Sequence, residues 1–275
     1  EGVVAELSGS NRVSVIETRA AGHATAVVRE HAPASDVVLA LGGDGLFNEV
    51  VNGAPSDVPI GFLPGGASNV LSRALGLPSD PLRAAARIAD STRTRRITLG
   101  VANGRRFAFA CGIGLDAEVV RAVDARGRAH GRRPGDHVFV TELAKLLWRR
   151  RRGGVTPIDL VGHGRVAMAV VANTSPYTYA GPLPIRVSPT ATFEGGLDIV
   201  APIDVGPRTV ARLVWHLTLR PGTRARVPGV RYLLDTDRAE LVADLAVPVQ
   251  VDGEDIGDVR ELVLEAERGA ISVLV

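Results

Sequence analysis

Lysine is almost absent from this 275-residue chain: Lys145 is the only one, and nearly all of the other basic side chains are arginines. No lysine follows a glycine-rich turn, which excludes the glycine–lysine phosphate loop of many nucleotide-binding proteins. Any nucleotide phosphates would therefore have to be held by backbone N–H groups, by arginines or by a metal ion.

Cysteine and aromatic residues are also scarce. Cys111 is the only cysteine, so an internal disulfide is excluded and a reducing compartment fits. Aromatic residues make up 4% of the chain, too few stacking surfaces to favour a binder of single-stranded nucleic acid. The histidines lack zinc-site spacing, no signal peptide is visible, and the uncharged stretch 166–185 is too polar and proline-rich for a membrane span. We expect a cytoplasmic protein that does not bind nucleic acid.

The first 93 residues alternate short apolar runs with helical stretches. Buried strands are predicted at 36–41 and 58–63, and helices at 46–54, 70–75 and 81–89. Such alternation is typical of a parallel sheet with helices on its faces. We predict a doubly wound parallel α/β domain over residues 1–93.

From residue 94 onward the pattern changes to short strands separated by Gly, Pro and Asp. These strands are predicted at 96–101, 107–110, 166–171, 197–200, 248–251 and 271–275. Helical insertions are predicted at 116–123 and 137–148. The pattern is typical of an antiparallel β-sandwich, which we assign to residues 94–275.

The charges of the chain are unevenly distributed. Residues 121–152 carry ten basic and three acidic side chains, whereas residues 235–267 carry eleven acidic side chains and two arginines. Trp148 followed by Arg149–Arg152 places an interfacial aromatic beside four cations, each worth about 1 kcal/mol near an anionic leaflet. We expect this segment to contact a membrane; the alternative is a solvated helix end.

A glycine-rich turn lies between a predicted strand and a predicted helix at Gly42-Gly43-Asp44-Gly45. Glycines let a ligand approach the backbone, and the helix start stabilises an anion by roughly 0.3–1 kcal/mol. Asp44 would repel a phosphate unless it served a divalent metal ion or accepted a proton. The alternative is a plain turn in which Asp44 caps the helix.

A second turn, Gly65-Gly66-Ala67-Ser68-Asn69, follows the next predicted strand in the same way. Ser68 or Asn69 can cap the helix that begins at Val70. Neighbouring parallel strands open into one crevice at their carboxyl ends, where ligands bind in open α/β sheets. The two turns together predict a ligand site at this edge.

Five segments in this order resemble the motifs of the diacylglycerol kinase catalytic domain family, which includes bacterial lipid kinases and sphingosine kinases. They are residues 42–53, 64–78, 109–118, 194–198 and 251–254. The resemblance implies an N-terminal nucleotide domain, a C-terminal β-sandwich lipid domain and chemistry in the cleft between them. It implies an ATP- and Mg²⁺-dependent kinase that phosphorylates a lipid hydroxyl, diacylglycerol-like, at the inner membrane face.

The resemblance also implies roles for particular residues. Glu254 matches the proton acceptor, with Asp44 assisting the metal or the proton transfer. Asp116 matches a lipid head-group contact, and Glu194 matches a ligand of a structural magnesium. The residues implied to bind ATP are Thr18, Gly42, Gly43, Asp44, Gly45, Leu46, Phe47, Asn48, Gly65, Gly66, Ala67 and Asn69.

The chain departs from the family pattern at three places. Leu46 replaces a threonine, as it does in sphingosine kinases, and Ala67 replaces a second threonine whose hydroxyl should contact ATP. The family's first strand and its Asn-Pro phosphate loop are absent from residues 1–9, and we expect a truncated chain. These departures keep open a non-catalytic lipid-binding relative.

An NAD kinase-like enzyme is the nearest catalytic alternative, because its nucleotide turn and two-domain plan are similar. Asp252-Gly253-Glu254 and the asparagine-containing helix after the first turn favour a lipid substrate. The sequence does not select the lipid, and it leaves a homodimer open.

Overall fold

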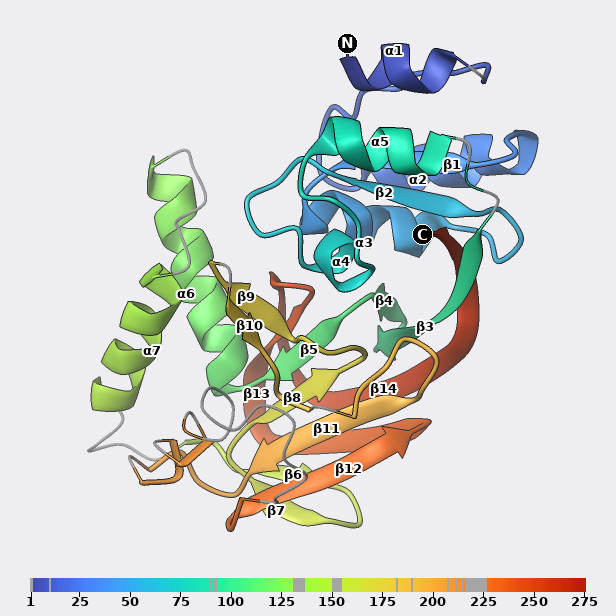
Figure 1. The fold of residues 1–275 in the computed structure, drawn as a ribbon. Coiled ribbons are helices and arrows are strands. Elements are labelled where there is room, and N and C mark those ends of the chain that lie inside the picture. The colour runs from blue at the N-terminus through green and yellow to red at the C-terminus, as the bar shows by residue number, and fades with distance from the viewer. Residues whose placement is uncertain are drawn as a thin grey trace.

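The computed structural model describes residues 2–9, 11–89, 91, 93–130, 137–149, 155–181, 183–188, 190–206, 208–210, 212–213, 215 and 227–275. The described chain forms two lobes, a smaller α/β lobe at the top of Figure 1 and a larger β-rich lobe below it.

The N-terminal lobe is built on two parallel strands, β1 (Val38–Gly42) and β2 (Ile60–Pro64), which pair from Val38↔Ile60 to Gly42↔Pro64. Its helices are α1 (Gly2–Ser8), α2 (His23–His31), α3 (Asp44–Gly53), α4 (Val70–Ala74) and α5 (Pro81–Ala89), with a 3₁₀ turn at Ala32–Ala34. Figure 1 shows α5 on one side of β2 and both α3 and α4 on the other. The helices therefore cover both faces of the parallel strands, as predicted.

Burial explains why this segment folds as it does. Every residue of β2 is buried, as expected for an uninterrupted apolar run between two helical layers. The ring of Phe62 lies 5.0 Å from that of Phe47 on α3, and Ala84, Ala85 and Ile88 form the buried stripe of α5.

The C-terminal lobe contains the remaining strands and two helices, and its strands pair antiparallel with one another. The elements are β3 (Thr94–Ala102), β4 (Arg105–Phe107), β5 (Ala110–Ile113), α6 (Leu115–His130), α7 (His137–Arg149), β6 (Ile158–Leu160), β7 (Gly164–Val166), β8 (Ala169–Ala172), β9 (Thr178–Ala180), β10 (Leu183–Ile185), β11 (Leu197–Pro202), β12 (Val230–Thr236), β13 (Arg238–Val251) and β14 (Glu254–Leu274). Buried residues from β5, β6, β8, β11, β13 and β14 share one core. The α/β class with a β-rich second part is thus confirmed.

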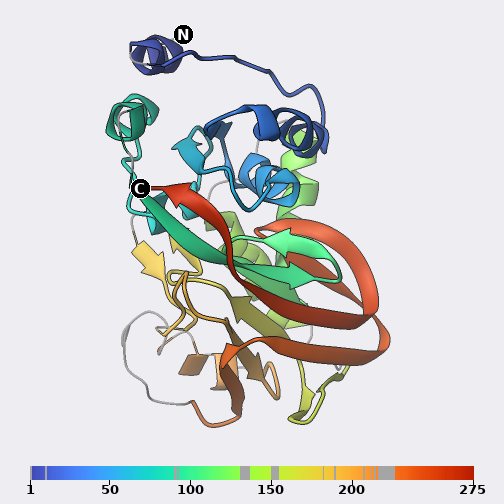
Figure 2. The ribbon, with the colours of Figure 1, turned by 90° about the vertical axis from the view of Figure 1, so that its right-hand side faces the viewer.

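One sheet runs through both lobes, in the order β1-β2-β14-β13-β5-β8-β11-β12. The end of β14 returns to the N-terminal lobe, where Val273 pairs in parallel with Ile60. Figure 2 shows β14 curving upward from the lower lobe to the C-terminus beside β2. Ile271 and Val273 therefore belong to the core of the N-terminal lobe.

Four predicted strands differ from the observed ones. The strand predicted at 107–110 is broken at Ala108 and Phe109, because the N–H groups there bind a buried carboxylate (see below). The strand predicted at 166–171 is broken at Ala167 and Met168. The short strands predicted at 248–251 and 271–275 are parts of the long strands β13 and β14.

No helix within the described residues is both long and apolar enough to cross a bilayer.

Candidate active site

The two glycine turns pack directly against each other. The backbone N–H of Gly65 donates to the carbonyl of Gly42 over 2.7 Å. A Cβ atom added to Gly66 would lie 2.6 Å from the Cα of Gly43, and one added to Gly65 would lie 3.1 Å from the Cα of Gly42. This approach of backbone to backbone requires glycine in both turns. The two turns therefore lie side by side, as the edge rule for parallel strands predicts.

Only part of the N–H groups in these turns can receive a ligand. The Gly65 N–H is used as described, and the Gly66 N–H donates to Oδ1 of Asn69, whose Nδ2 donates back to the Gly66 carbonyl. Asn69 therefore closes the second turn with its side chain.

The amides left for an anion lie at two adjoining places. Helix α3 has no side-chain cap at Gly43, and among the described residues the N–H groups of Gly45, Leu46, Ala67 and Ser68 have no hydrogen-bond acceptor. The side chain of Leu46 packs over Gly42 and against the core of the N-terminal lobe, so only the backbone of Leu46 faces the turn. These N–H groups form the candidate anion site.

Asp44 is the first residue of α3 and is buried, 6% exposed. Its Oδ1 accepts a hydrogen bond from the N–H of Leu71 in the first turn of α4, over 3.2 Å. Its carboxylate therefore joins the starts of the two helices that follow the glycine turns.

The side chains of Phe47 and Asn48, two of the residues predicted to bind ATP, are buried in the protein, and their contact with a nucleotide stays a prediction. Phe47 is buried against Phe62 and its N–H is bonded to Gly43. Asn48 is 1% exposed, and its Nδ2 donates to Asp252 Oδ2 over 2.9 Å and to the carbonyl of Arg106 over 3.0 Å. One turn into a helix these positions face inward, so Asn48 binds the second lobe.

Glu254 reaches from the second lobe to the first glycine turn. It begins β14 after a tight turn at Asp252 and Gly253, both with positive φ (48° and 80°), as a two-residue hairpin of type I′ requires. A Cβ atom added to Gly45 would lie 2.6 Å from Oε1 of Glu254. The predicted proton acceptor therefore lies at the start of α3, beside the candidate anion site.

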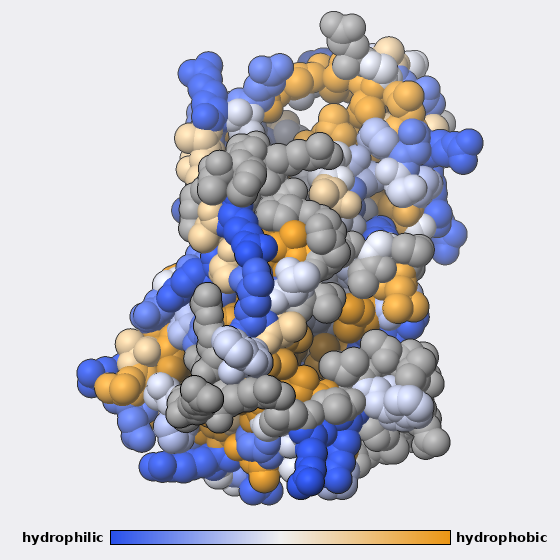
Figure 3. All heavy atoms as spheres, turned by 90° about the vertical axis from the view of Figure 1, so that its left-hand side faces the viewer, coloured by the Kyte–Doolittle hydropathy of each residue, from blue (hydrophilic) through white to orange (hydrophobic). Residues whose placement is uncertain are grey.

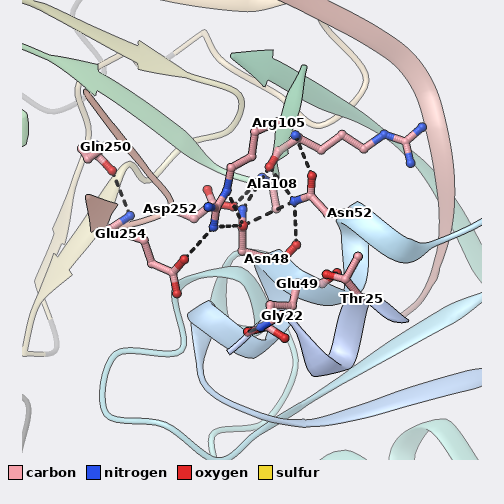
Figure 4. A network of polar contacts seen from close by, with 12 residues as sticks. Gly22, Thr25, Asn48, Glu49, Asn52, Arg105, Ala108, Gln250, Asp252 and Glu254 are labelled. Atoms are coloured by element: carbon pink, nitrogen blue, oxygen red, sulfur yellow. Dashed lines mark hydrogen bonds and ion pairs between the residues drawn. The ribbon is translucent and has the colours of Figure 1, made fainter. Parts of the chain in front are cut away.

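Arg105 on β4 holds the other oxygen of this carboxylate, with Nη2 2.7 Å from Oε2 of Glu254 (Figure 4). Burial raises the pKa of Glu254 above its ordinary value, and the neighbouring Arg105 opposes this rise. The outcome is a carboxylate that takes up a proton more readily than an exposed glutamate, a property that suits a general base.

Asp252, which the sequence placed in a motif but gave no role of its own, is a buried anchor. Its carboxylate accepts the N–H groups of Ala108 (2.7 Å), Phe109 (2.9 Å) and Ala110 (3.0 Å), besides the amide of Asn48. Burial raises the pKa of Asp252 to about 6, although these hydrogen bonds oppose the rise. Asp252 thus fixes the bend between β4 and β5 and ties it to α3.

Asp116, the predicted head-group contact, lies at the start of α6. Its Oδ2 accepts hydrogen bonds from the hydroxyl of Tyr177 and from Nε2 of Gln250, each over 2.8 Å. The Oε1 of Gln250 accepts the N–H of Gly253, so a chain of hydrogen bonds leads from Asp116 to the turn that carries Glu254. Burial raises the pKa of Asp116, and the bonds from Gln250 and Tyr177 oppose the rise.

Thr18 lies in an exposed segment without regular secondary structure, and no interaction within the described residues brings its side chain to the glycine turns. The segment ends at the start of α2, where the N–H groups of Gly22 and Ala24 donate to the carboxylate of Glu49 on α3. The contact of Thr18 with a nucleotide stays a prediction.

Glu194 forms an ion pair with Arg95, and the cavity that it lines includes no residue of the glycine turns. It lines a cavity of about 410 Å³ together with Asp198, Asp235 and Arg268. Asp235 is paired with Arg268, and Asp198 accepts hydrogen bonds from Ser188 and Thr190. Within the described part of the chain no cluster of three or more His, Cys, Asp or Glu side chains could hold a metal ion, and magnesium at Glu194 stays a prediction.

The predicted membrane segment is described only in part. Trp148, near the end of α7, is 69% exposed. The side chain of Arg149 and all of residues 150–152 lie outside the described residues. Figure 3 faces the side that carries α6 and α7, and in the described part of this face apolar residues are scattered among hydrophilic ones.

Known proteins resemble the N-terminal part of the chain in sequence. Residues 3–102 match the model of the family "Diacylglycerol kinase catalytic domain". A diacylglycerol kinase from Bacillus subtilis (strain 168) is 38% identical over 113 residues, which are 40% of this chain and 37% of that protein. One from Staphylococcus haemolyticus (strain JCSC1435) is 43% identical over 75 residues, 26% of this chain and 22% of that protein. The matched stretch thus spans about a third or less of these relatives.

Solved structures resemble nearly the whole chain. The crystal structure of a diacylglycerol kinase from Bacillus anthracis str. Sterne covers 99% of this chain and 87% of its own, with 18% identity and a TM-score of 0.71. A second structure from the same organism covers 99% and 89%, with 21% identity and a TM-score of 0.77. This likeness establishes the shared fold. The resemblance inferred from the sequence motifs is confirmed for residues 3–102, which match the diacylglycerol kinase catalytic domain family and relatives named diacylglycerol kinase.

Proposed function

We propose that the protein is an ATP-dependent lipid kinase, which transfers the γ-phosphoryl group to the hydroxyl of a diacylglycerol-like lipid. The observation that carries the proposal is the contact of Glu254 Oε1 with Gly45 at the start of α3. It places a partly buried carboxylate from one lobe beside the unpaired N–H groups of the other. The relatives named diacylglycerol kinase support the reaction class.

The residues at the glycine turns fit the triphosphate of ATP with Mg²⁺. The N–H groups of Gly45, Leu46, Ala67 and Ser68 would hold phosphate oxygens, a task that needs no lysine. Asp44 is the carboxylate nearest to these groups in sequence and would serve the metal ion. When bound, Mg²⁺ would neutralise charge on the transferring group.

The protein's own part in the transfer is to align the groups and move one proton. The oxygen of the lipid hydroxyl bonds to the γ-phosphorus, while the bond from that phosphorus to the bridging oxygen of ADP breaks. The hydroxyl proton passes to Oε1 of Glu254. A general base of this kind contributes ~10²–10⁴-fold to the rate.

The lipid would be reached at a membrane surface, with the protein bound peripherally. Trp148, exposed at the end of a helix that leads into arginines, supports this docking site. A bilayer interface favours such a pairing of an aromatic ring with cations.

The test is to incubate the full chain with radiolabelled ATP and a total lipid extract, and to identify the labelled product by mass spectrometry. Asp44→Asn and Glu254→Gln should each abolish labelling while the circular dichroism spectrum stays unchanged. Labelling of added NAD instead of lipid would assign the protein to the NAD kinases. Lipid binding without any labelling would make it a non-catalytic lipid binder.

A further inference from the structure

Arg105 lies where three elements of the two lobes meet. Its guanidinium donates to Oδ1 of Asn48 on α3, over 2.9 Å from Nη2 and 3.3 Å from Nε, and to Oε2 of Glu254 at the start of β14 over 2.7 Å. Figure 4 shows the side chain between the asparagine and the glutamate. One planar group thus joins the helix of the nucleotide lobe to the predicted base.

This contact gives the two carboxylate oxygens of Glu254 different surroundings. Oε2 is held by Arg105, whereas Oε1 faces Gly45, and no hydrogen bond to Oε1 occurs within the described residues. A carboxylate that rotated freely about its last bond would present either oxygen to the turn. The arginine fixes which oxygen is left to receive a proton.

Arg105 is itself held in place by an amide of fixed orientation. The Nδ2 of Asn48 donates to the buried carboxylate of Asp252, so its Oδ1 must point the other way, toward the guanidinium. A planar guanidinium with two such acceptors has little freedom, unlike an ammonium group on a flexible chain.

We propose that Arg105 is a positioning residue of the kinase reaction, which clamps Glu254 so that Oε1 faces the start of α3. This inference rests on the proposed function and deepens it. Arg105 acts through Glu254 and does not itself touch the transferred group.

Arg105 also affects the pKa of Glu254, which can be measured. Burial raises the pKa of Glu254, Arg105 lowers it, and the carboxylates of Glu49 on α3 and Asp124 on α6 raise it. Without the guanidinium of Arg105, the charged groups that act on Glu254 are the carboxylates of Glu49 and Asp124. The pKa of Glu254 should then rise further.

The chain offers a matched control on the same strand. Arg106 is also ion-paired, to Glu267 over 2.7 Å, and it donates to the carbonyls of Val51 and Ala54 at the end of α3. It has no bond to Glu254. Arg106→Gln removes the same charge one residue away and should lower the free energy of unfolding while leaving turnover unchanged.

The experiment compares Arg105→Gln, Arg105→Lys and Arg106→Gln in the full chain. For Arg105→Gln we expect kcat to fall about 10²-fold, as misplacing a catalytic group by about 1 Å can do. The KM for ATP should stay within about twofold, and the acid limb of the pH–kcat profile should move to higher pH. Arg105→Lys keeps a positive charge but not the bridge, so it should leave the acid limb in place with an intermediate kcat.

A titration without substrate separates this inference from the proposed function. Carbon-13 NMR of the glutamate carboxyl groups, with the Glu254 signal assigned by its loss in Glu254→Gln, reports the pKa directly. An equal Glu254 pKa in wild type and Arg105→Gln overturns the role of Arg105, whether or not any lipid is phosphorylated. A raised pKa with no lipid phosphorylated removes only the proposed function.

Discussion

Oε1 of Glu254 lies so close to the backbone of Gly45 that a methyl group on that glycine would sit 2.6 Å from it. The two residues are 209 positions apart in sequence and belong to different lobes. Gly45 is therefore required for the space it leaves open to a carboxylate, since its φ is not among the positive values found in the chain.

Gly45→Ala should separate stability from activity. Alanine in the first turn of α3 suits a helix better than glycine by roughly 0.5–1 kcal/mol, so the free energy of unfolding should stay equal or rise. The added methyl group must displace Glu254, and kcat should fall at least about tenfold. Urea unfolding and steady-state kinetics on the same preparation measure both.

A second substitution provides the control. Glu254→Asp shortens the side chain, so Gly45→Ala should cost less activity in the Glu254→Asp background than in wild type. Equal losses in both backgrounds would show that the methyl group acts elsewhere.

Glu254→Gln should lower kcat by ~10²–10⁴-fold, because the amide cannot accept the hydroxyl proton. The side chain keeps its shape and can still accept a hydrogen bond from Arg105. The melting temperature should therefore change little, which differential scanning calorimetry can check. Full turnover in this variant would remove Glu254 from the reaction.

The pH dependence of kcat follows from the direction of the same pKa. Because burial raises the pKa of Glu254, the base becomes protonated at a higher pH than an exposed glutamate does. Activity should fall as the pH is lowered through this raised pKa, above the ordinary value of 4.5. A profile flat down to the ordinary glutamate range would contradict the assignment.

Asp252 should make the stability of the fold pH-dependent. Its pKa of about 6 in the folded protein exceeds the ordinary value of 3.8, so the folded state holds a proton that the unfolded state has lost. This contribution is fully present below about pH 4 and is lost as the pH rises through 6, on the order of 2–3 kcal/mol. Urea unfolding of wild type and Asp252→Asn at pH 4.5 and pH 7 measures it.

Asp252→Asn carries no titrating proton and should lack this component. It should also be less stable at both pH values, since its NH₂ group meets the backbone N–H donors of residues 108–110. Parallel pH curves for the two proteins would refute the link to Asp252.

Trp148 should contribute to binding of anionic vesicles. An exposed tryptophan beside cations loses its interfacial contact when it is replaced by alanine, so sedimentation with phosphatidylglycerol vesicles should weaken. Trp215, 54% exposed, is the matched control for the loss of a surface tryptophan. Equal binding of wild type and Trp148→Ala would place the docking surface elsewhere.

The local pattern of the sequence predicted the elements of the N-terminal lobe well. The helix predicted at 81–89 is observed as Pro81–Ala89. Apolar spacing and glycine turns are local signals, and they suffice where a strand and a helix alternate. The pairing of the two turns followed from the edge rule for parallel strands.

The contacts between the lobes could not be predicted in this way. The family resemblance implies that Asn48 binds ATP, but it gives no sign that the buried Asn48 side chain donates a hydrogen bond to Asp252 of the other lobe. Arg105 carries no local signal, and the motif that contains Asp252 does not reveal its role, because both roles depend on a strand and a turn about 150 residues apart. The bend at Ala108 and Phe109 was missed for the same reason: its cause is a carboxylate distant in sequence.

Strand β14 begins at Glu254 and ends, without interruption, beside β2 at Leu274. Along the way it is paired with β3, whose first residues also lie in the upper lobe. The paired strands β3 and β14 thus connect the two lobes as an antiparallel ribbon. A substitution that disturbs the packing of Val273 in the N-terminal lobe should therefore also move Glu254, which lies at the other end of β14.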